Sequence, residues 1–270
     1  MDWLQAMVLA LIQGLTEFLP ISSSAHLLLP STLFGWADQG LAFDVAVHVG
    51  SLMAVLVYFR VEIINMTKAW FISLPKITSS EKLDQDARLA WAVILGTIPV
   101  GLVGLVFKSF IEDNFRSAFV IAMSTISFAL LLWVADHRSR GNRDEYGLRF
   151  KDIMIVGFAQ AIALIPGTSR SGITMTAGLM LGLTRQAAAR FSFLLSIPVI
   201  CLAGGLLLYE LAQQSTPVAW AEIAIGLGVS SISAYACIHA FLTLIDKIGF
   251  LPFIVYRIAL GALILGMIGI

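Results

Sequence analysis

The chain has 270 residues, of which 59% are hydrophobic and only 13% are charged, and its mean hydropathy is +0.90. A soluble domain carries about 25% charged residues, so this composition excludes an ordinary soluble enzyme. It predicts an all-α polytopic membrane protein in which residues 1–270 form one integral domain. The net charge is zero, so the expected partner is the lipid bilayer and no nucleic acid is indicated.

Two apolar segments are interrupted. The first, about 3–33, breaks at "LPISSSAH", and the second, about 153–184, breaks at "IPGTSRSG". Proline ends helices, and glycine and serine favour turns. Each half is about 11 to 15 residues long, too short to cross a bilayer alone. The two segments are therefore expected to be re-entrant helix pairs that return to the side from which they enter.

Six further stretches are long and apolar enough to read as complete spans. They are expected at about 41–59, 89–107, 117–135, 191–211, 221–245 and 251–270, since about 20 apolar residues cross a bilayer. The short, mixed segment 62–74 is expected to lie along the membrane interface. Arg257, about six residues into the last span, is expected to extend its charge toward the nearby membrane surface.

The basic residues suggest an orientation. Most Lys and Arg fall in 60–88, in 136–152 and just after the second break, which all lie on one side if each span crosses once. That side is expected to be the cytoplasm, with both termini in the periplasm. Residues 1–135 and 153–270 then have the same order of elements in opposite orientations. We therefore expect an inverted-topology repeat of about ten helices, which typically places a site near the bilayer midplane.

The first break contains a carboxylate where a charge is costly. Glu17 lies within "QGLTEFLPISSSAH", and a charge in the hydrocarbon costs a few kcal/mol, so it should face protein or a water-filled cavity. Gln13, four residues earlier, shares its helix face. A purely structural carboxylate, bonded to the serines beyond the turn, is the alternative. The break continues with Ser22, Ser23, Ser24 and His26, where one serine would cap a helix whose N-terminus suits an anion.

The second break contains an arginine among hydroxyls: Thr168, Ser169, Arg170, Ser171 and Thr174. A guanidinium suits phosphate oxygens, and the alternative is an internal counter-ion for Glu17. Together the breaks supply the parts of a phosphoryl-transfer site: a nucleophile or base, charge stabilisation, and acidic oxygens for a divalent cation. The chain has neither a Walker A loop nor an HExxH helix.

With these residues in place, the sequence resembles a known family. "QGLTEFLPISSSAH" resembles the [E/Q]xxxE motif, with its serines and histidine, of the undecaprenyl-diphosphate phosphatase family, also called bacitracin-resistance proteins, and "PGTSRSGIT" resembles that family's PGxSRSxxT motif. "FSFLLSIP" and "LPFIVYR" also look like family segments. The family motif residues fall on Gln13, Glu17, Ser22, Ser23, His26, Ser169, Arg170, Ser171 and Thr174.

The resemblance implies a bacterial inner-membrane enzyme that removes the terminal phosphate of a C55 isoprenoid diphosphate. It returns the carrier lipid to peptidoglycan synthesis, requires Mg²⁺ or Ca²⁺, and has a site that opens toward the periplasm. Two departures from the family pattern stand out. Gln13 stands where the family often has Glu, which puts a second carboxylate in doubt, and Ser24 and Ala25 replace a Thr-Gly pair.

We expect Glu17, Ser23, His26 and Arg170 to be catalytic, with Glu17 also a metal ligand. The expected substrate-binding residues are Gln13, Ser22, Ser24, Thr168, Ser169, Ser171 and Thr174. Three questions stay open from the sequence. The nucleophile is Ser23, His26 or water; the chain either hydrolyses or transports a phosphorylated isoprenoid; and it acts alone or as a homodimer.

Overall fold

The computed structural model describes residues 2–36, 40–76, 82–139, 141–213 and 219–269. Within them all regular secondary structure is helical, apart from one isolated β-bridge between Arg143 and Leu183. The α-helices are α1 (Trp3–Thr16), α2 (Ser23–Phe34), α3 (Leu41–Tyr58), α4 (Arg60–Ser73), α5 (Gln85–Phe115), α6 (Ala118–Arg138), α7 (Phe150–Ile162), α8 (Arg170–Met180), α9 (Arg185–Ala212), α10 (Trp220–Ile248) and α11 (Leu251–Met267). Two 3₁₀ turns, η1 (Leu74–Lys76) and η2 (Glu145–Gly147), connect them.

Both interrupted segments are pairs of short helices, as expected. The first pair, α1 and α2, has 14 and 12 residues, and the second pair, α7 and α8, has 13 and 11. Five helices, α3, α5, α6, α9 and α10, are long and apolar enough to cross a membrane. The expected sixth span is α11, which is apolar but only 17 residues long. The all-helical, multi-pass architecture is therefore confirmed.

Several helices differ in extent from the expectation, and α9, expected from 191, already begins at Arg185. The stretch expected as a span at 89–107 is helix α5, which begins at Gln85 and runs to Phe115, although the apolar run of the sequence ends at Phe107, before Lys108. Charged residues beyond a membrane span do not break a helix once water can solvate them, so the change in composition does not mark the end of the helix. The interfacial segment expected at 62–74 is helix α4, which begins two residues earlier, at Arg60.

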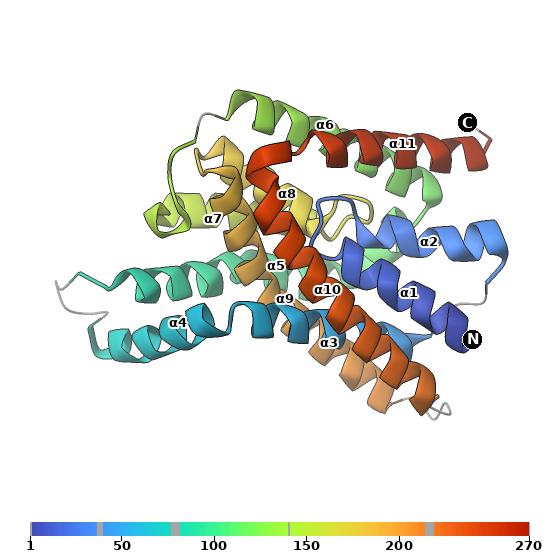
Figure 1. Ribbon diagram of the computed structural model, residues 1–270, viewed down its shortest axis with the longest axis horizontal. Coiled ribbons are helices and arrows are strands. Elements are labelled where there is room, and N and C mark those ends of the chain that lie inside the picture. Colours follow the sequence, from blue (N-terminus) through green and yellow to red (C-terminus); the bar gives the residue numbers. More distant parts are fainter. Residues whose placement is uncertain (1, 37–39, 77–81, 140, 214–218, 270) are drawn as a thin grey trace.

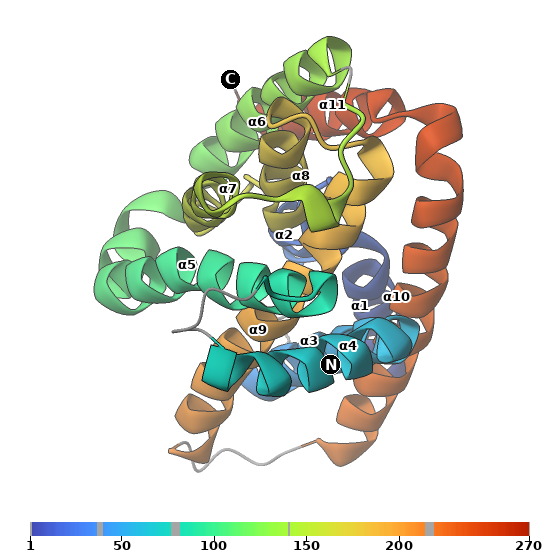
Figure 2. The same cartoon turned by 90° about the vertical axis from the view of Figure 1, so that its left-hand side faces the viewer.

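The helices pack in groups that bring the two breaks together. Helix α10 packs on α1 and α3, α5 packs on α7 and α9, and α6 packs on α11 and α8. Figure 1 shows α6 and α11 side by side along one edge, with the blue and yellow breaks near the middle of the molecule. Figure 2 shows α10 along another edge. Phe18 of the first break meets Phe193 of α9 edge-on, at 5.3 Å between ring centroids.

Ion pairs connect the stretches that the charge pattern placed on one side. Arg185 binds Asp136 at 2.6 Å, and Arg190 binds Glu145 at 2.6 Å and Glu62 at 3.2 Å. Separate basic segments of the sequence thus lie at the same end of the molecule. These pairs are partly exposed and contribute little stability individually, but they fix the α4, η2 and α9 ends against one another.

Candidate functional site

Glu17 lies at the point where both breaks meet. It follows the last residue of α1, and its side chain is only 10% exposed. Gln13 Nε2 donates to Glu17 Oε2 at 3.0 Å, one helical turn back as the spacing predicts. Ser23 Oγ donates to the same oxygen at 3.4 Å. The carboxylate therefore has one hydrogen-bond partner on α1 and one on α2, across the first break.

Arg170 approaches the same carboxylate from the second break. Its Nη2 lies 3.3 Å from Glu17 Oε1 and 3.4 Å from the Glu17 carbonyl oxygen, and its Nη1 donates to the Ser192 carbonyl at 3.1 Å. The guanidinium side chain is 12% exposed. A charge-assisted N–H···O bond usually measures about 2.7–2.9 Å, so this ion pair is long. A phosphate oxygen could therefore compete for the same donors.

Hydroxyl groups of the second break fix its position. Ser169 caps α8 by accepting from the Gly172 N–H at 3.1 Å, which leaves the first N–H groups of α8 directed outward, as an anion site requires. Ser171 Oγ donates to the Leu19 carbonyl at 2.7 Å, a direct bond between the breaks. Thr174 Oγ1 lies 2.7 Å from Ser192 Oγ. These hydroxyls hold α8 against the first break and α9.

The backbone is strained at matching positions of the two breaks. Ser22 has φ 71° and precedes α2, and Ser169 has φ 68° and precedes α8. Serine rarely adopts this region, and each such residue costs on the order of 1–3 kcal/mol. The surrounding contacts therefore hold both turns in conformations that the local sequence does not favour. Strain of this kind concentrates at functional sites.

His26 is buried and both of its ring nitrogens have partners. Nδ1 lies 2.7 Å from the Ser22 carbonyl, which only accepts, so Nδ1 carries the proton. In the neutral ring Nε2 then accepts from the Tyr256 hydroxyl at 2.7 Å. The two rings are nearly parallel, with 8° between their planes. His26 thus connects the strained turn of the first break to α11.

Arg257 lies beside the candidate site, and the sequence pattern predicted its position wrongly. Instead of reaching the membrane surface, its side chain is completely buried. Its guanidinium donates to four backbone carbonyls: Thr125 at 3.2 Å, Pro20 at 3.3 Å, Gly167 at 3.0 Å and Thr168 at 2.9 Å. One side chain therefore bonds both breaks and α6. The sequence predicted the position of Arg257 along α11 but not the side of the helix on which it lies. Its side chain lies on the side that contacts α6 and both breaks, and it is therefore buried.

Gly172 leaves room for this guanidinium. A Cβ at this position would lie 2.7 Å from Arg257 Nη1, closer than real contacts allow. The glycine that follows "SRS" is thus required by the close approach of α11 to the start of α8. A single methyl group there would displace the arginine from the carbonyls that it bonds.

The structure brings together most of the expected site residues. Glu17, Gln13, Ser23 and Arg170 are in direct contact, and Ser22, His26, Ser169, Ser171 and Thr174 surround them. Thr168 is buried with its hydroxyl unpartnered, and its carbonyl accepts from Arg257. The side chain of Ser24 lies outside the described residues. Tyr256 and Arg257 also lie beside these residues, although the sequence analysis did not assign them to the site. Both belong to the segment "LPFIVYR", and Arg257 was expected near the membrane surface.

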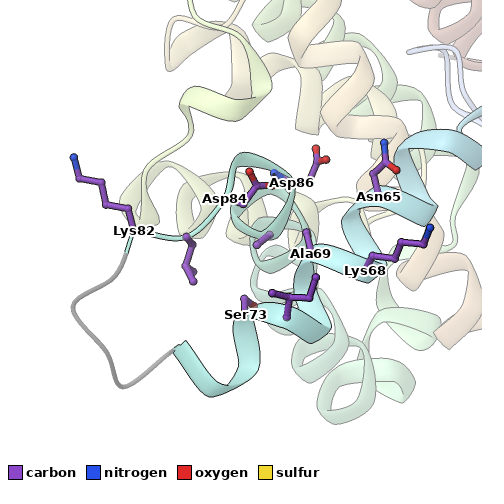
Figure 3. Close-up of a pocket in the computed structure, with 10 residues that line it drawn as sticks. Asn65, Lys68, Ala69, Ser73, Lys82, Asp84 and Asp86 are labelled. Atoms are coloured by element: carbon purple, nitrogen blue, oxygen red, sulfur yellow. Dashed lines mark hydrogen bonds between the residues drawn. The ribbon is translucent and has the colours of Figure 1, made fainter.

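Cavities elsewhere do not contain these residues. One cavity, of about 500 Å³, lies between α4 and the start of α5. It is lined by Lys68, Lys82, Asp84 and Asp86 among others (Figure 3). Charges of both signs at an exposed helix–loop junction do not select one ligand. The described residues also contain no group of three His, Cys, Asp or Glu side chains placed to hold a metal ion.

Comparison with known proteins identifies the family. Residues 6–263 match the family described as "Bacitracin resistance protein BacA". "Undecaprenyl-diphosphatase 2" of Stutzerimonas stutzeri is 59% identical, with 98% of each chain aligned. The proteins named "Undecaprenyl-diphosphatase" of Hahella chejuensis and Thioalkalivibrio sulfidiphilus are 60% and 57% identical, over 97% and 98% of each chain. The match extends over nearly the whole chain, and the chain therefore belongs to the family of bacitracin resistance protein BacA.

Proposed function

We propose that this chain hydrolyses undecaprenyl diphosphate to undecaprenyl phosphate and inorganic phosphate, recycling the lipid carrier of peptidoglycan synthesis and thereby conferring resistance to bacitracin. The observation that supports this most directly is the contact between Glu17 and Arg170, 3.3 Å apart and contributed by different breaks. Family membership supports the reaction, and the contact supports a site between the two breaks. The experiment is phosphate release from a C55 or C15 isoprenoid diphosphate by the purified full-length chain.

Arg170 and the start of α8 would bind the diphosphate. In this structure the guanidinium bonds one carboxylate and two carbonyls. Phosphate oxygens are better acceptors for its planar set of N–H donors. The outward N–H groups at the α8 N-terminus add partial positive charge at the same place. Binding of the substrate would thus release Glu17 from Arg170, which makes the carboxylate available as a base.

Ser23 is the nucleophile that the geometry favours. Its hydroxyl already donates to Glu17 Oε2, whereas both nitrogens of His26 are engaged. Glu17 would take the hydroxyl proton as Ser23 Oγ attacks the terminal phosphorus and the bridging P–O bond breaks. That proton then passes to the departing undecaprenyl phosphate. Water, deprotonated by Glu17, hydrolyses the phosphoserine and regenerates both side chains.

Replacing Ser23 tests this assignment. Ser23→Ala should reduce turnover by at least about 100-fold and abolish any acid-stable phosphoserine that rapid quenching traps on residues 13–26. His26→Gln should retain the phosphoserine, because its amide can still bond the Ser22 carbonyl. A Ser23→Ala enzyme that turns over normally would assign the attack to water instead.

A divalent cation fits the donor atoms at this site. Glu17 supplies a carboxylate, and Gln13 Oε1 is buried beside it without a hydrogen-bond partner. Mg²⁺ is commonly bound through one or two carboxylates plus substrate phosphate oxygens, so Glu17 and Gln13 would hold an ion that the diphosphate also binds. When bound, the ion neutralises charge on the transferring phosphate.

Gln13 gives a specific prediction about the metal. Gln13→Glu adds a second carboxylate one helical turn from Glu17 and should lower the Mg²⁺ concentration for half-maximal activity several-fold, whereas Gln13→Leu should raise it. The measurement is a Mg²⁺ titration of phosphate release, with EDTA as the zero point. An unchanged half-maximal concentration in both variants would remove Gln13 from the metal site.

The inverted repeat also belongs to this proposal. Helices α1 and α2 correspond to α7 and α8, and the two strained serines occupy the same place in each pair. Gln13 and Gln160 are both fully buried and precede those serines by equal numbers of residues. The basic end, which carries Arg185 and Arg190, would be cytoplasmic, with both termini and the opening of the site toward the periplasm.

A further inference from the structure

An apolar pocket of about 340 Å³ lies against the second break. Its walls come from α5 and α9, and Leu164 and Pro166 of the α7–α8 turn form the side that faces the break. Pro166 belongs to the same turn as Thr168 and Arg170. Any molecule in the pocket therefore touches the element to which we assign the diphosphate.

The pocket is open toward the hydrocarbon of the membrane. It lies along the apolar parts of α5 and α9, and Leu105 and Leu202, which line it, are 74% and 58% exposed. Arg116, which follows α5, also lines the pocket. A chain could therefore enter sideways from the bilayer without crossing a polar surface.

Two glycines of α5 leave this space open. A Cβ added at Gly101 or Gly104 would approach no neighbour closer than 3.7 Å, an ordinary contact. Nearer the start of the same helix, a Cβ at Gly96 would lie only 3.2 Å from Leu195, so Gly96 permits the close packing of α5 against α9. Larger side chains at Gly101 and Gly104 would instead extend into the pocket, without strain in the helix.

We propose that this pocket holds the isoprene units next to the diphosphate of the substrate. This rests on the proposed function, because the diphosphate must lie at the second break for its chain to begin beside Pro166. The affinity comes from van der Waals contact between these isoprene units and the pocket walls, because a chain that leaves the bilayer hydrocarbon gains close packing rather than removal from water. The pocket thereby selects a substrate that carries a chain over a bare diphosphate. A phospholipid of the bilayer is the rival occupant, and its phosphate would lie at Arg116.

The test compares substrates that differ only in chain length. The full-length chain is purified in detergent with Mg²⁺, and kcat/KM is measured for farnesyl diphosphate and isopentenyl diphosphate. Gly104→Leu and Gly101→Leu should lower kcat/KM for the farnesyl substrate by about 10- to 100-fold and leave that for the isopentenyl substrate within about twofold. Gly205→Leu is the matched control, since Gly205 is an exposed glycine of α9 with no atom near its Cβ position. It should change neither value.

Several results would overturn the assignment. An equal loss on both substrates would mean that the leucines disturb the site itself, and no loss on either would mean that the substrate chain lies elsewhere. If the wild type released phosphate from neither substrate, the proposed function itself would fail, which is a different result from loss of selectivity in an active enzyme.

Discussion

Glu17→Gln should lower the turnover of isoprenoid diphosphate by about 10²- to 10⁴-fold, the range typical for removal of a general base. The amide is nearly the same size and still accepts from Ser23, but it cannot take the proton of the attacking hydroxyl. The measurement is steady-state phosphate release under saturating Mg²⁺. Substrate affinity should fall much less than turnover, because Arg170 keeps its donors.

A matched control is Glu222→Gln, which removes a carboxylate from the first turn of α10. It should leave turnover within about twofold. Because Glu17→Gln also leaves Arg170 nearly buried without its counter-charge, thermal unfolding in detergent is needed to show that the variant is folded. A folded Glu17→Gln protein with normal turnover would contradict the role of this carboxylate.

Arg257→Met should be among the most destabilising single substitutions in the chain, at about 3–5 kcal/mol. Methionine fills much of the volume but cannot donate to the four backbone carbonyls of the two breaks and α6, of which only that of Gly167 keeps another side-chain donor, Thr125 Oγ1. Each buried acceptor that loses its partner costs about 1–3 kcal/mol. Activity should fall with stability, because the breaks that position Glu17 and Arg170 lose their common contact.

Arg60→Met is the comparison for this variant. Arg60 is exposed and bonds only the nearby Val57 carbonyl, so its replacement should change stability by less than about 0.5 kcal/mol. Both variants are compared with the wild type by thermal unfolding in one detergent. Equal unfolding temperatures for the two variants would contradict the view that Arg257 holds the breaks together.

The sequence predicted the breaks because their cause is local. Pro20 cannot continue a helix, and Pro166 with Gly167 stops the second one, so the positions of both turns follow from residue type alone. The pairing of Glu17 with Arg170 was also foreseeable, because an intramembrane charge needs a partner. Membership of a known family then assigned the chemistry.

The remaining features depend on contacts distant in sequence. Arg257 looked like a residue near a membrane surface, and only the packing of α11 against α6 and the breaks shows that it is buried. The positive φ angles of Ser22 and Ser169 were not foreseeable either, since serine has no preference for that conformation. Contacts between elements that are distant in sequence impose this backbone conformation. The length of α5 was missed because composition marks the edge of the membrane rather than the end of a helix.

The most direct test of the account is a double-mutant cycle on phosphate release. Wild type, Glu17→Gln, Arg170→Gln and the double variant are compared for kcat/KM on a C55 isoprenoid diphosphate with Mg²⁺. If the two breaks form one phosphoryl-transfer site, the double variant should be hardly slower than the slower single variant, as for residues that act as a unit. Effects that multiply would show that Glu17 and Arg170 act independently. A folded wild type that releases no phosphate would contradict the phosphatase assignment and favour transport of the lipid.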